Sequence, residues 1–158
     1  MPKKANYMPA GYHTATPYLV IRNAAQAVEF YKRAFGATEL FRMTRPDGTI
    51  THGEIQIGDT RFMFTEEGAM PSYKSPQNLN GSPVSIYLYV EDADHIFRQA
   101  VAAGATQIMP VEDMFWGDRY GRLTDPYGHE WHVATHQEDV APAEMERRAA
   151  AATAASHA

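Results

Sequence analysis

A histidine and a carboxylate alternate along one stretch of the chain. His52, Glu54 and Gln56 fall on one face of a strand and Ile55 and Ile57 on the other, because successive side chains point to opposite sides. His52 beside Glu54 could act as a general base if its pKa lies near the working pH and it reaches a substrate proton. A hydrogen-bonded structural pair is an equally good interpretation. The candidate catalytic residues are therefore His52 and Glu54.

Aromatic and polar side chains also share a face in the second half of the chain. Tyr87 and Tyr89 alternate with aliphatic residues and lie on the same face as Ser85, and His132 alternates with apolar neighbours. Aromatic walls with a few polar groups are typical of small-molecule sites. Strand propensity alone would also explain the two tyrosines. We interpret Tyr87, Tyr89 and His132 as candidate ligand-binding residues.

The densest group of functional residue types is the run from Phe115 to Gly121. It places two aromatic residues, a glycine and the pair Asp118–Arg119 between predicted strands. Arg119 could bind an anionic ligand through its forked guanidinium group. Alternatively, Arg119 pairs with an aspartate and fixes the loop, while Trp116 covers the core. Both interpretations stay open, and Trp116, Asp118 and Arg119 are further candidates for ligand binding.

The elements that must position these residues occur twice in the same order. Each half has a strand, an amphipathic helix that stops at a glycine, and three more strands. The first half is expected to contain Thr16–Arg22, a helix from the N-cap Asn23 to Gly36, Thr38–Thr44, Thr49–Ile57 and Thr60–Thr65. The second is expected to contain Val84–Val90, a helix Ala93–Ala103 capped by Asp92, Thr106–Pro110, Asp118–Thr124, a turn at Asp125–Gly128, and Glu130–Thr135. Gly-Ala-Thr follows both helices, at residues 36–38 and 104–106, which indicates an internal duplication.

This repeated order predicts an α+β fold made of two βαβββ modules. The expected organisation is a flexible N-terminal arm at 1–13, a first module at 14–66, a linker loop at 67–83, a second module at 84–137 and an Ala-rich helix or tail at 138–158. In the tail, Pro142 suits a first helical turn and Ala143–Ala155 has high helix propensity. Its apolar content is nearly all alanine, so it is expected to bury little.

Composition excludes several classes of protein. The chain has 158 residues, no cysteine and a net charge of −5, with its lysines and arginines scattered. Disulfides, thiolate metal sites and a cysteine nucleophile are excluded, and a nucleic-acid surface is disfavoured. No signal-peptide pattern and no apolar run of about 20 residues is present, so a cytoplasmic protein without a membrane partner is expected. His13 and His136 are expected to be solvated, and His129 to lie at the surface or brace a turn.

Several motifs together resemble one superfamily. They are Tyr18-Leu-Val-Ile-Arg, Ala27-Val-Glu-Phe-Tyr-Lys-Arg-Ala-Phe-Gly-Ala, His52-Gly-Glu-Ile, Ser82-Pro-Val-Ser-Ile-Tyr-Leu-Tyr-Val, Phe115-Trp-Gly-Asp-Arg-Tyr-Gly and Asp125-Pro-Tyr-Gly-His-Glu-Trp. Over residues 14–140 the chain is similar to the vicinal oxygen chelate superfamily of glyoxalases, bleomycin-resistance proteins and extradiol dioxygenases, and within it to the PhnB-like branch. The resemblance implies curved mixed sheets around a central cavity, with helices on the convex face. Tyr18 would join His52, Glu54 and the second-half residues in lining that cavity.

The resemblance also implies four metal-ligand positions. They fall at Thr16, at Phe62 or Phe64 depending on register, at Ser85 and at His132. Only His132 is a good ligand, so no cofactor is predicted. A divalent metal remains conceivable through a rearranged set of His52, Glu54, Glu66 and His132, because a one-residue register slip would change which side chains face inward.

Two functions follow from this resemblance. The first is a glyoxalase-like enzyme related to lyases, isomerases or dioxygenases, with a degenerate metal site. The second is a non-catalytic protein that binds a small molecule or drug, as the resistance members do. The superfamily also implies a homodimer, for which the rim around Trp116 and the loop Glu66–Pro83 are candidate contact surfaces.

Overall fold

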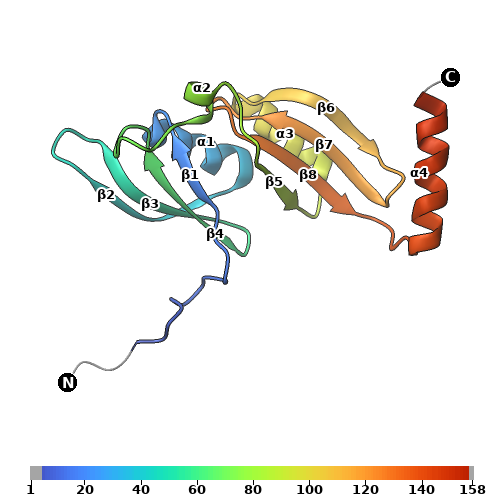
Figure 1. Ribbon diagram of the computed structural model, residues 1–158, viewed down its shortest axis with the longest axis horizontal. Helices are drawn as coiled ribbons and strands as arrows, with labels where there is room; N and C mark the ends of the chain where they lie inside the picture. Colours follow the sequence, from blue (N-terminus) through green and yellow to red (C-terminus); the bar gives the residue numbers. More distant parts are fainter. Residues whose placement is uncertain (1–4, 157–158) are drawn as a thin grey trace. The chain divides into compact units, whose positions relative to one another are not determined.

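The first half of the chain forms a four-stranded sheet covered by a helix. A computed structural model describes residues 5–156, and the chain divides into two compact units at Gly81 and Ser82. The elements of the first unit are β1 (Tyr18–Ile21), α1 (Ala24–Phe35), β2 (Thr38–Thr44), β3 (Ile50–Ile57), β4 (Thr60–Glu66) and the short α2 (Pro76–Leu79). The strand order is β1-β4-β3-β2, with β1 parallel to β4 and the other pairs antiparallel (Figure 1).

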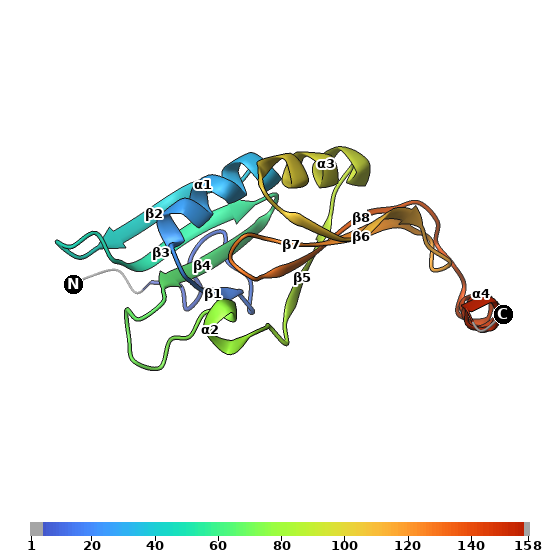
Figure 2. The ribbon, with the colours of Figure 1, turned by 90° about the horizontal axis from the view of Figure 1, so that it is seen from above.

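Helix α1 covers one face of this first sheet (Figure 2). Its buried stripe includes Ala27, Phe30 and Tyr31, and the facing strand residues Ile55 and Phe62 are also buried. Apolar residues lie at helical spacing on α1 and at alternate positions on the strands. Packing these two apolar faces together removes both from water. This packing confirms the predicted alternation in β3, which leaves the polar residues of that strand on the other face.

The start of α1 differs from the prediction. Asn23 adopts a left-handed conformation, with φ 63°, and its side chain makes no cap hydrogen bond. The carboxylate of Glu66, at the end of β4, instead accepts hydrogen bonds from the backbone N–H groups of Asn23 and Ala24, both at 2.8 Å. Glu66 supplies the acceptor for free N–H groups and a negative charge at the positive end of the helix.

The second half of the chain repeats this architecture. Its elements are β5 (Ser85–Tyr89), α3 (Ala93–Ala103), β6 (Thr106–Asp113), β7 (Asp118–Thr124), β8 (Glu130–His136) and α4 (Pro142–Ser156). The sheet order is β5-β8-β7-β6, again with one parallel pair, β5–β8. Asp92 caps α3 as predicted, accepting from the His95 N–H at 2.9 Å. Strand β6 continues past Pro110 to Asp113, beyond the predicted end.

The turn at Asp125–Gly128, the position of His129 and the connection 67–83 can each be compared with its prediction. Asp125–Gly128 forms the predicted turn, in which the Asp125 carboxylate accepts from the Tyr127 and His129 N–H groups. His129 is buried and its N–H bonds to Asp125 within this turn, so the predicted surface position is wrong and the alternative position at the turn is the one found. The segment 67–83 is a connection, as predicted, but it contains α2, whose N-cap Ser75 is fixed by hydrogen bonds to Glu67.

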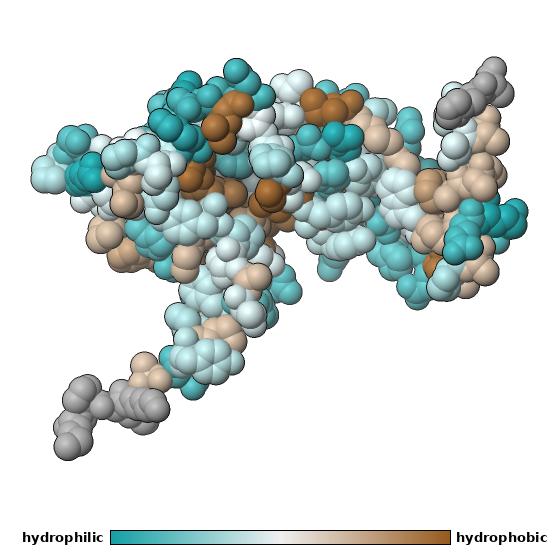
Figure 3. Space-filling model, viewed as in Figure 1, coloured by the Kyte–Doolittle hydropathy of each residue, from teal (hydrophilic) through white to brown (hydrophobic). Residues whose placement is uncertain are grey.

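The C-terminal residues that the structure describes form the predicted helix. No side chain of α4 between Pro142 and Ser156 is buried, as its alanine content led us to expect. Figure 3 shows the tan colour of alanine over much of its visible surface, with teal charged residues gathered at one part. Within residues 5–156, no helix combines the length and apolarity that crossing a membrane requires. The predicted arm and tail extend to residues 1–4 and 157–158, which lie outside the described residues.

Candidate ligand-binding site

The second sheet has one face turned away from its helix, and we call this its open face. Residues of β7 alternate: Arg119 bonds to Asp94 of α3, and a side chain at Gly121 would meet Phe97 of α3, so Asp118 and Tyr120 point the other way. The cross-strand partners on the open face share that direction. These open-face residues are Ser85, Tyr87, Tyr89, Asp118, Tyr120, Arg122, Thr124, Glu130, His132, Ala134 and His136.

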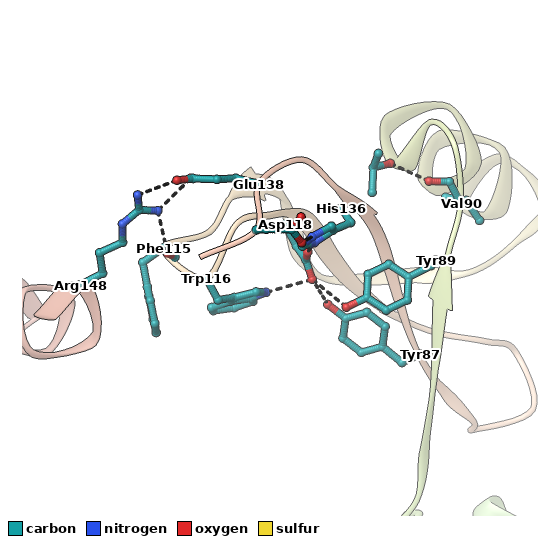
Figure 4. A network of polar contacts seen from close by, with 11 residues as sticks. Tyr87, Tyr89, Val90, Phe115, Trp116, Asp118, His136, Glu138 and Arg148 are labelled. Carbon is teal, nitrogen blue, oxygen red and sulfur yellow. Dashed lines mark hydrogen bonds and ion pairs between the residues drawn. The ribbon is translucent and has the colours of Figure 1, made fainter. Parts of the chain in front are cut away.

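A single buried carboxylate organises the aromatic groups at one end of this face. Asp118 is 3% exposed, and its Oδ2 accepts hydrogen bonds from the Tyr87 hydroxyl at 2.9 Å, the Tyr89 hydroxyl at 3.1 Å and Trp116 Nε1 at 3.2 Å. His136 Nδ1 lies 2.7 Å from Oδ1 (Figure 4). We call Asp118, Tyr87, Tyr89, Trp116 and His136 the Asp118 cluster. With four donors around it, the carboxylate is well compensated for its burial.

The electrostatics of the cluster favour the ionised form of Asp118 and the protonated forms of its partners. Burial disfavours the charge on Asp118, but the hydrogen bonds from His136, Tyr87, Tyr89 and Trp116 outweigh it and hold its pKa below the ordinary value. Burial, followed by the bond to Asp118, raises the pKa of Tyr87 and of Tyr89. Bonds to Asp118 and Asp139 raise the pKa of His136. The tyrosines therefore stay protonated and act as donors.

A second hydrogen-bonded chain runs beside the Asp118 cluster. The Tyr120 hydroxyl lies 2.5 Å from His132 Nδ1, and His132 Nε2 lies 2.9 Å from the Ser85 hydroxyl. Burial lowers the pKa of His132, which favours the neutral ring. A neutral ring that accepts from Tyr120 at Nδ1 and donates to Ser85 from Nε2 satisfies both contacts. The ring of Tyr87 stacks on His132 at 5.4 Å and 18°, and on Tyr120 at 5.7 Å and 25°.

Arg119 lies apart from these residues, on the helix side of the sheet. Its guanidinium group forms a forked pair with Asp94 and a further bond from Nη1 to Asp113 at 3.1 Å. This is the structural alternative considered for Arg119, in which aspartates fix it. The structure therefore does not bring Arg119 together with Trp116 and Asp118.

The open face of the first sheet carries the candidate catalytic pair. His52 Nε2 lies 3.3 Å from Glu54 Oε1, and its Nδ1 lies 3.4 Å from the Tyr18 hydroxyl. The rings of Tyr18 and Phe41 flank the imidazole at centroid distances of 5.9 and 6.3 Å. Tyr73, from the connection after β4, lies 6.2 Å from Tyr18. The structure thus brings Tyr18, His52 and Glu54 together, with polar contacts longer than those of the Asp118 cluster.

Part of the N-terminal arm lies against this first open face. The guanidinium of Arg61 stands over the Tyr12 ring at 5.0 Å, and Gly11 approaches Arg61 so closely that a β-carbon there would lie 2.5 Å from Nη2. The neighbouring Tyr12 hydroxyl and His52 lower the pKa of Glu54, against the effect of burial. Residues 11 and 12 are therefore packed on the sheet, although we predicted a flexible arm at 1–13.

Tyr120 and His136 were not among the site residues predicted from the sequence. Alternation from Asp118 would have placed Tyr120 on the open face, because the two residues are separated by one position in β7. His136 is exposed, as predicted, and it also bridges Asp118 and Asp139 at 2.7 and 2.9 Å. No pattern in the sequence predicts that bridge, because it depends on the pairing of β7 with β8.

The metal positions implied by the superfamily do not fit a metal ion. Phe62 and Phe64 are both buried on the helix side, and Met63, the residue between them, lies on the open face. The rearranged set loses Glu66, because its carboxylate caps α1. Across residues 5–156, no group of three or more histidine, aspartate or glutamate side chains is arranged to hold a metal. Hydroxyl, thioether and phenyl groups are poor ligands for the divalent ions concerned.

Comparison with known proteins defines the class. The profile of the Glyoxalase/Bleomycin resistance protein/Dioxygenase superfamily matches residues 12–133. An uncharacterised protein of Mycobacterium bovis is 41% identical over 128 residues, which cover 79% of this chain and 84% of that one. Protein YjdN of Escherichia coli is 26% identical over 139 residues, covering 75% and 92%. This chain belongs to the Glyoxalase/Bleomycin resistance protein/Dioxygenase superfamily.

Solved structures agree with this membership. A gene product of Arabidopsis thaliana superposes with a TM-score of 0.65 at 26% identity, covering 80% of this chain and 99% of the other. TioX from Micromonospora gives a TM-score of 0.60 at 28% identity, covering 77% and 98%. A PhnB protein from Bacillus cereus shares the fold, with a TM-score of 0.61, 20% identity and coverage of 78% and 99%.

Proposed function

We propose that this protein binds a small planar organic molecule against the open face of its second sheet and holds it without converting it. The observation that carries the proposal is the stacked set of Tyr87, Tyr120 and His132 rings. Tyr87 is 42% exposed, and Tyr89 beside it is 65% exposed. A planar ligand could extend such a stack and remove apolar ring surface from water.

The rings are fixed before a ligand arrives. Tyr87 and Tyr89 are both anchored at their hydroxyls to Asp118, and Tyr120 is anchored to His132. A site whose side chains are already ordered loses less conformational entropy on binding, which supports affinity. Exposed but immobile aromatic surface is therefore better suited to binding than a set of free rotamers.

The polar groups of this face support binding over catalysis. A general base must have a free lone pair and a pKa near the working pH. The Asp118 carboxylate is surrounded by four donors with a lowered pKa, and the pKa values of Tyr87 and Tyr120 are raised by burial. His132 has partners at both ring nitrogens. Each group is committed to its neighbours, so the face offers shape and stacking rather than proton transfer.

A second function is favoured by one observation on the first module. His52 has contacts of 3.3 and 3.4 Å to Glu54 and Tyr18, long enough for a substrate to replace either partner. In this alternative, His52 takes a proton from a carbon or oxygen acid while Glu54 stabilises the imidazolium. A variant His52→Gln that retains full ligand affinity but loses turnover of that ligand would favour the enzyme over the binding protein.

Binding is tested with a planar fluorescent probe, 8-anilinonaphthalene-1-sulfonate, measured by titration and equilibrium dialysis. We expect saturable binding at one site per chain and an affinity about tenfold weaker in Tyr87→Ala, the usual size of effect for a central aromatic contact. Tyr7→Ala is the matched control, because Tyr7 is 95% exposed and lies outside both sheets. Equal affinities in the two variants would contradict the proposal.

A further inference from the structure

Helix α4 is attached to the rest of the second module through one side chain in particular. Arg148 donates from Nη1 and Nη2 to the Glu138 carboxylate at 2.9 and 2.8 Å, and from Nη1 to the Phe115 carbonyl at 3.3 Å. Its Nε also donates to Glu144 on its own helix, at 2.7 Å. The guanidinium therefore joins the helix both to the segment after β8 and to the β6–β7 turn (Figure 4).

The two segments that Arg148 joins also contact each other closely. The backbone N–H groups of Gln137 and Glu138 both donate to the Gly117 carbonyl, at 2.9 and 3.1 Å. Gly117 has φ +99°, and a β-carbon there would lie 2.2 Å from the Glu138 carbonyl oxygen. The turn needs glycine at this position both for its conformation and for the close approach of the backbone.

Trp116 lies in that turn and reaches the open face. Its indole N–H donates to Asp118, and its ring makes edge contacts with Phe115 at 5.1 Å and Tyr120 at 5.4 Å. The carbonyl that Arg148 binds belongs to Phe115, the residue directly before Trp116. A change in the Arg148 contact therefore acts on the turn that orients the indole.

We infer that Arg148 is a positioning residue for the ligand site: α4 clamps the 114–117 turn through this side chain and so fixes Trp116 as one wall of the open face. The expected effect on ligand affinity rests on the proposed function. The expected effect on the turn rests on the contacts described above. It also gives the exposed C-terminal helix a role that does not need a buried apolar face. The uncharged alanine half of the helix takes no part in the clamp.

The chain contains a matched control for this side chain. Arg147 is the preceding residue on the same helix, but within residues 5–156 its guanidinium pairs with Glu144 alone, and its side chain is 72% exposed. Arg148→Met and Arg147→Met remove the same charge from the same helix. Only the first should disturb the turn.

The first measurement needs no ligand. Acrylamide quenching of tryptophan fluorescence reports Trp116, because Trp131 is buried, and Trp116→Phe supplies the background. We expect quenching to rise about two- to fivefold in Arg148→Met and in Glu138→Gln, in line with the loss of a partly exposed ion pair, and to stay unchanged in Arg147→Met. Far-ultraviolet circular dichroism should be the same for all of them. Equal quenching in Arg148→Met and Arg147→Met would overturn the inference.

The second measurement adds the naphthalene probe. We expect its dissociation constant to rise about two- to fivefold in Arg148→Met relative to Arg147→Met. If quenching changes while the affinity does not, Trp116 is positioned by α4 but is not a wall of the site, and the inference fails. If the wild-type chain binds no probe, the proposed function fails, and quenching alone still decides whether Arg148 holds the turn.

Discussion

The two modules pair their first and last strands in the same register but differ in what their open faces carry. Tyr18 pairs with Met63 across β1–β4, and Tyr87 pairs with His132 across β5–β8. Along the next strand, β3 has a register shift between Ile50 and His52, whereas β7 continues its pairing with β8 without a shift to Asp118. Among the described residues of the first module, no carboxylate is buried as Asp118 is in the second.

This difference separates the demands of folding from those of binding. The helix-facing position occupied by Phe62 in one module and Trp131 in the other stays large and apolar, because each sheet must bury one face against its helix. The open faces carry no such requirement and have diverged. One carboxylate, Asp118, is enough to turn separate aromatic residues into an ordered surface.

The largest effect is expected from substitutions at the core position that the two modules share. Phe62→Ala and Trp131→Ala should each lower the free energy of unfolding of their module by about 3–5 kcal/mol. Trp131→Ala should be the more damaging, because it also removes the hydrogen bond from Trp131 Nε1 to Asp125 at 2.9 Å. Denaturant unfolding, with amide hydrogen exchange resolved by module, measures both. Equal loss of protection in both modules from either change would contradict the division into two units.

An intermediate effect tests the register-equivalent tyrosines. Tyr87→Phe removes a 2.9 Å hydrogen bond to a buried carboxylate and should cost about 1–2 kcal/mol. Tyr18→Phe removes only a 3.4 Å contact with His52 and should cost less than about 0.5 kcal/mol. Denaturant midpoints at fixed slope give the comparison. The contrast between the modules is wrong if Tyr18→Phe proves the more destabilising.

The smallest effect concerns pH. His136 faces Asp118, Asp139 and the ring of Tyr89, and its raised pKa means that the folded state binds its proton more tightly than the unfolded state. Its contribution is fully present below the unfolded value of about 6.5 and is lost as pH rises through the folded pKa. His136→Gln should therefore differ from wild type most at about pH 5–6 and least in mild alkali.

The control for the pH experiment is the exposed His95 of α3, and thermal melting between about pH 5 and 9 is the measurement. His95→Gln should follow the wild-type pH dependence throughout. If the stability that His136→Gln loses relative to wild type grows as pH rises, the sign is opposite to the one expected. The bridge from His136 to Asp118 and Asp139 then does not explain the pH dependence.

Much of the fold could be predicted because its signals are local. Alternation in β3 separated His52 and Glu54 from Ile55, and helical spacing identified α1 and α3. The cap of α1 could not be predicted, because Glu66 is far from Asn23 in sequence and reaches it only after β4 pairs beside β1. Local sequence patterns predict which face of a helix or strand is apolar. The pairing of distant strands decides which charged side chain reaches the free N–H groups at a helix end.

The candidate site, like the fold, was predictable only where its signals are local. Sequence alone determined the repeated βαβββ order, the apolar faces and the types of residue available for chemistry, because side-chain periodicity and helix or turn propensity act within a few residues. Only the tertiary structure decided that Asp118 would collect Tyr87, Tyr89, Trp116 and His136, and that Arg119 would face α3. Those contacts join β5, β7 and β8, and a hydrogen bond forms only where strand pairing brings a donor within about 3 Å of its acceptor.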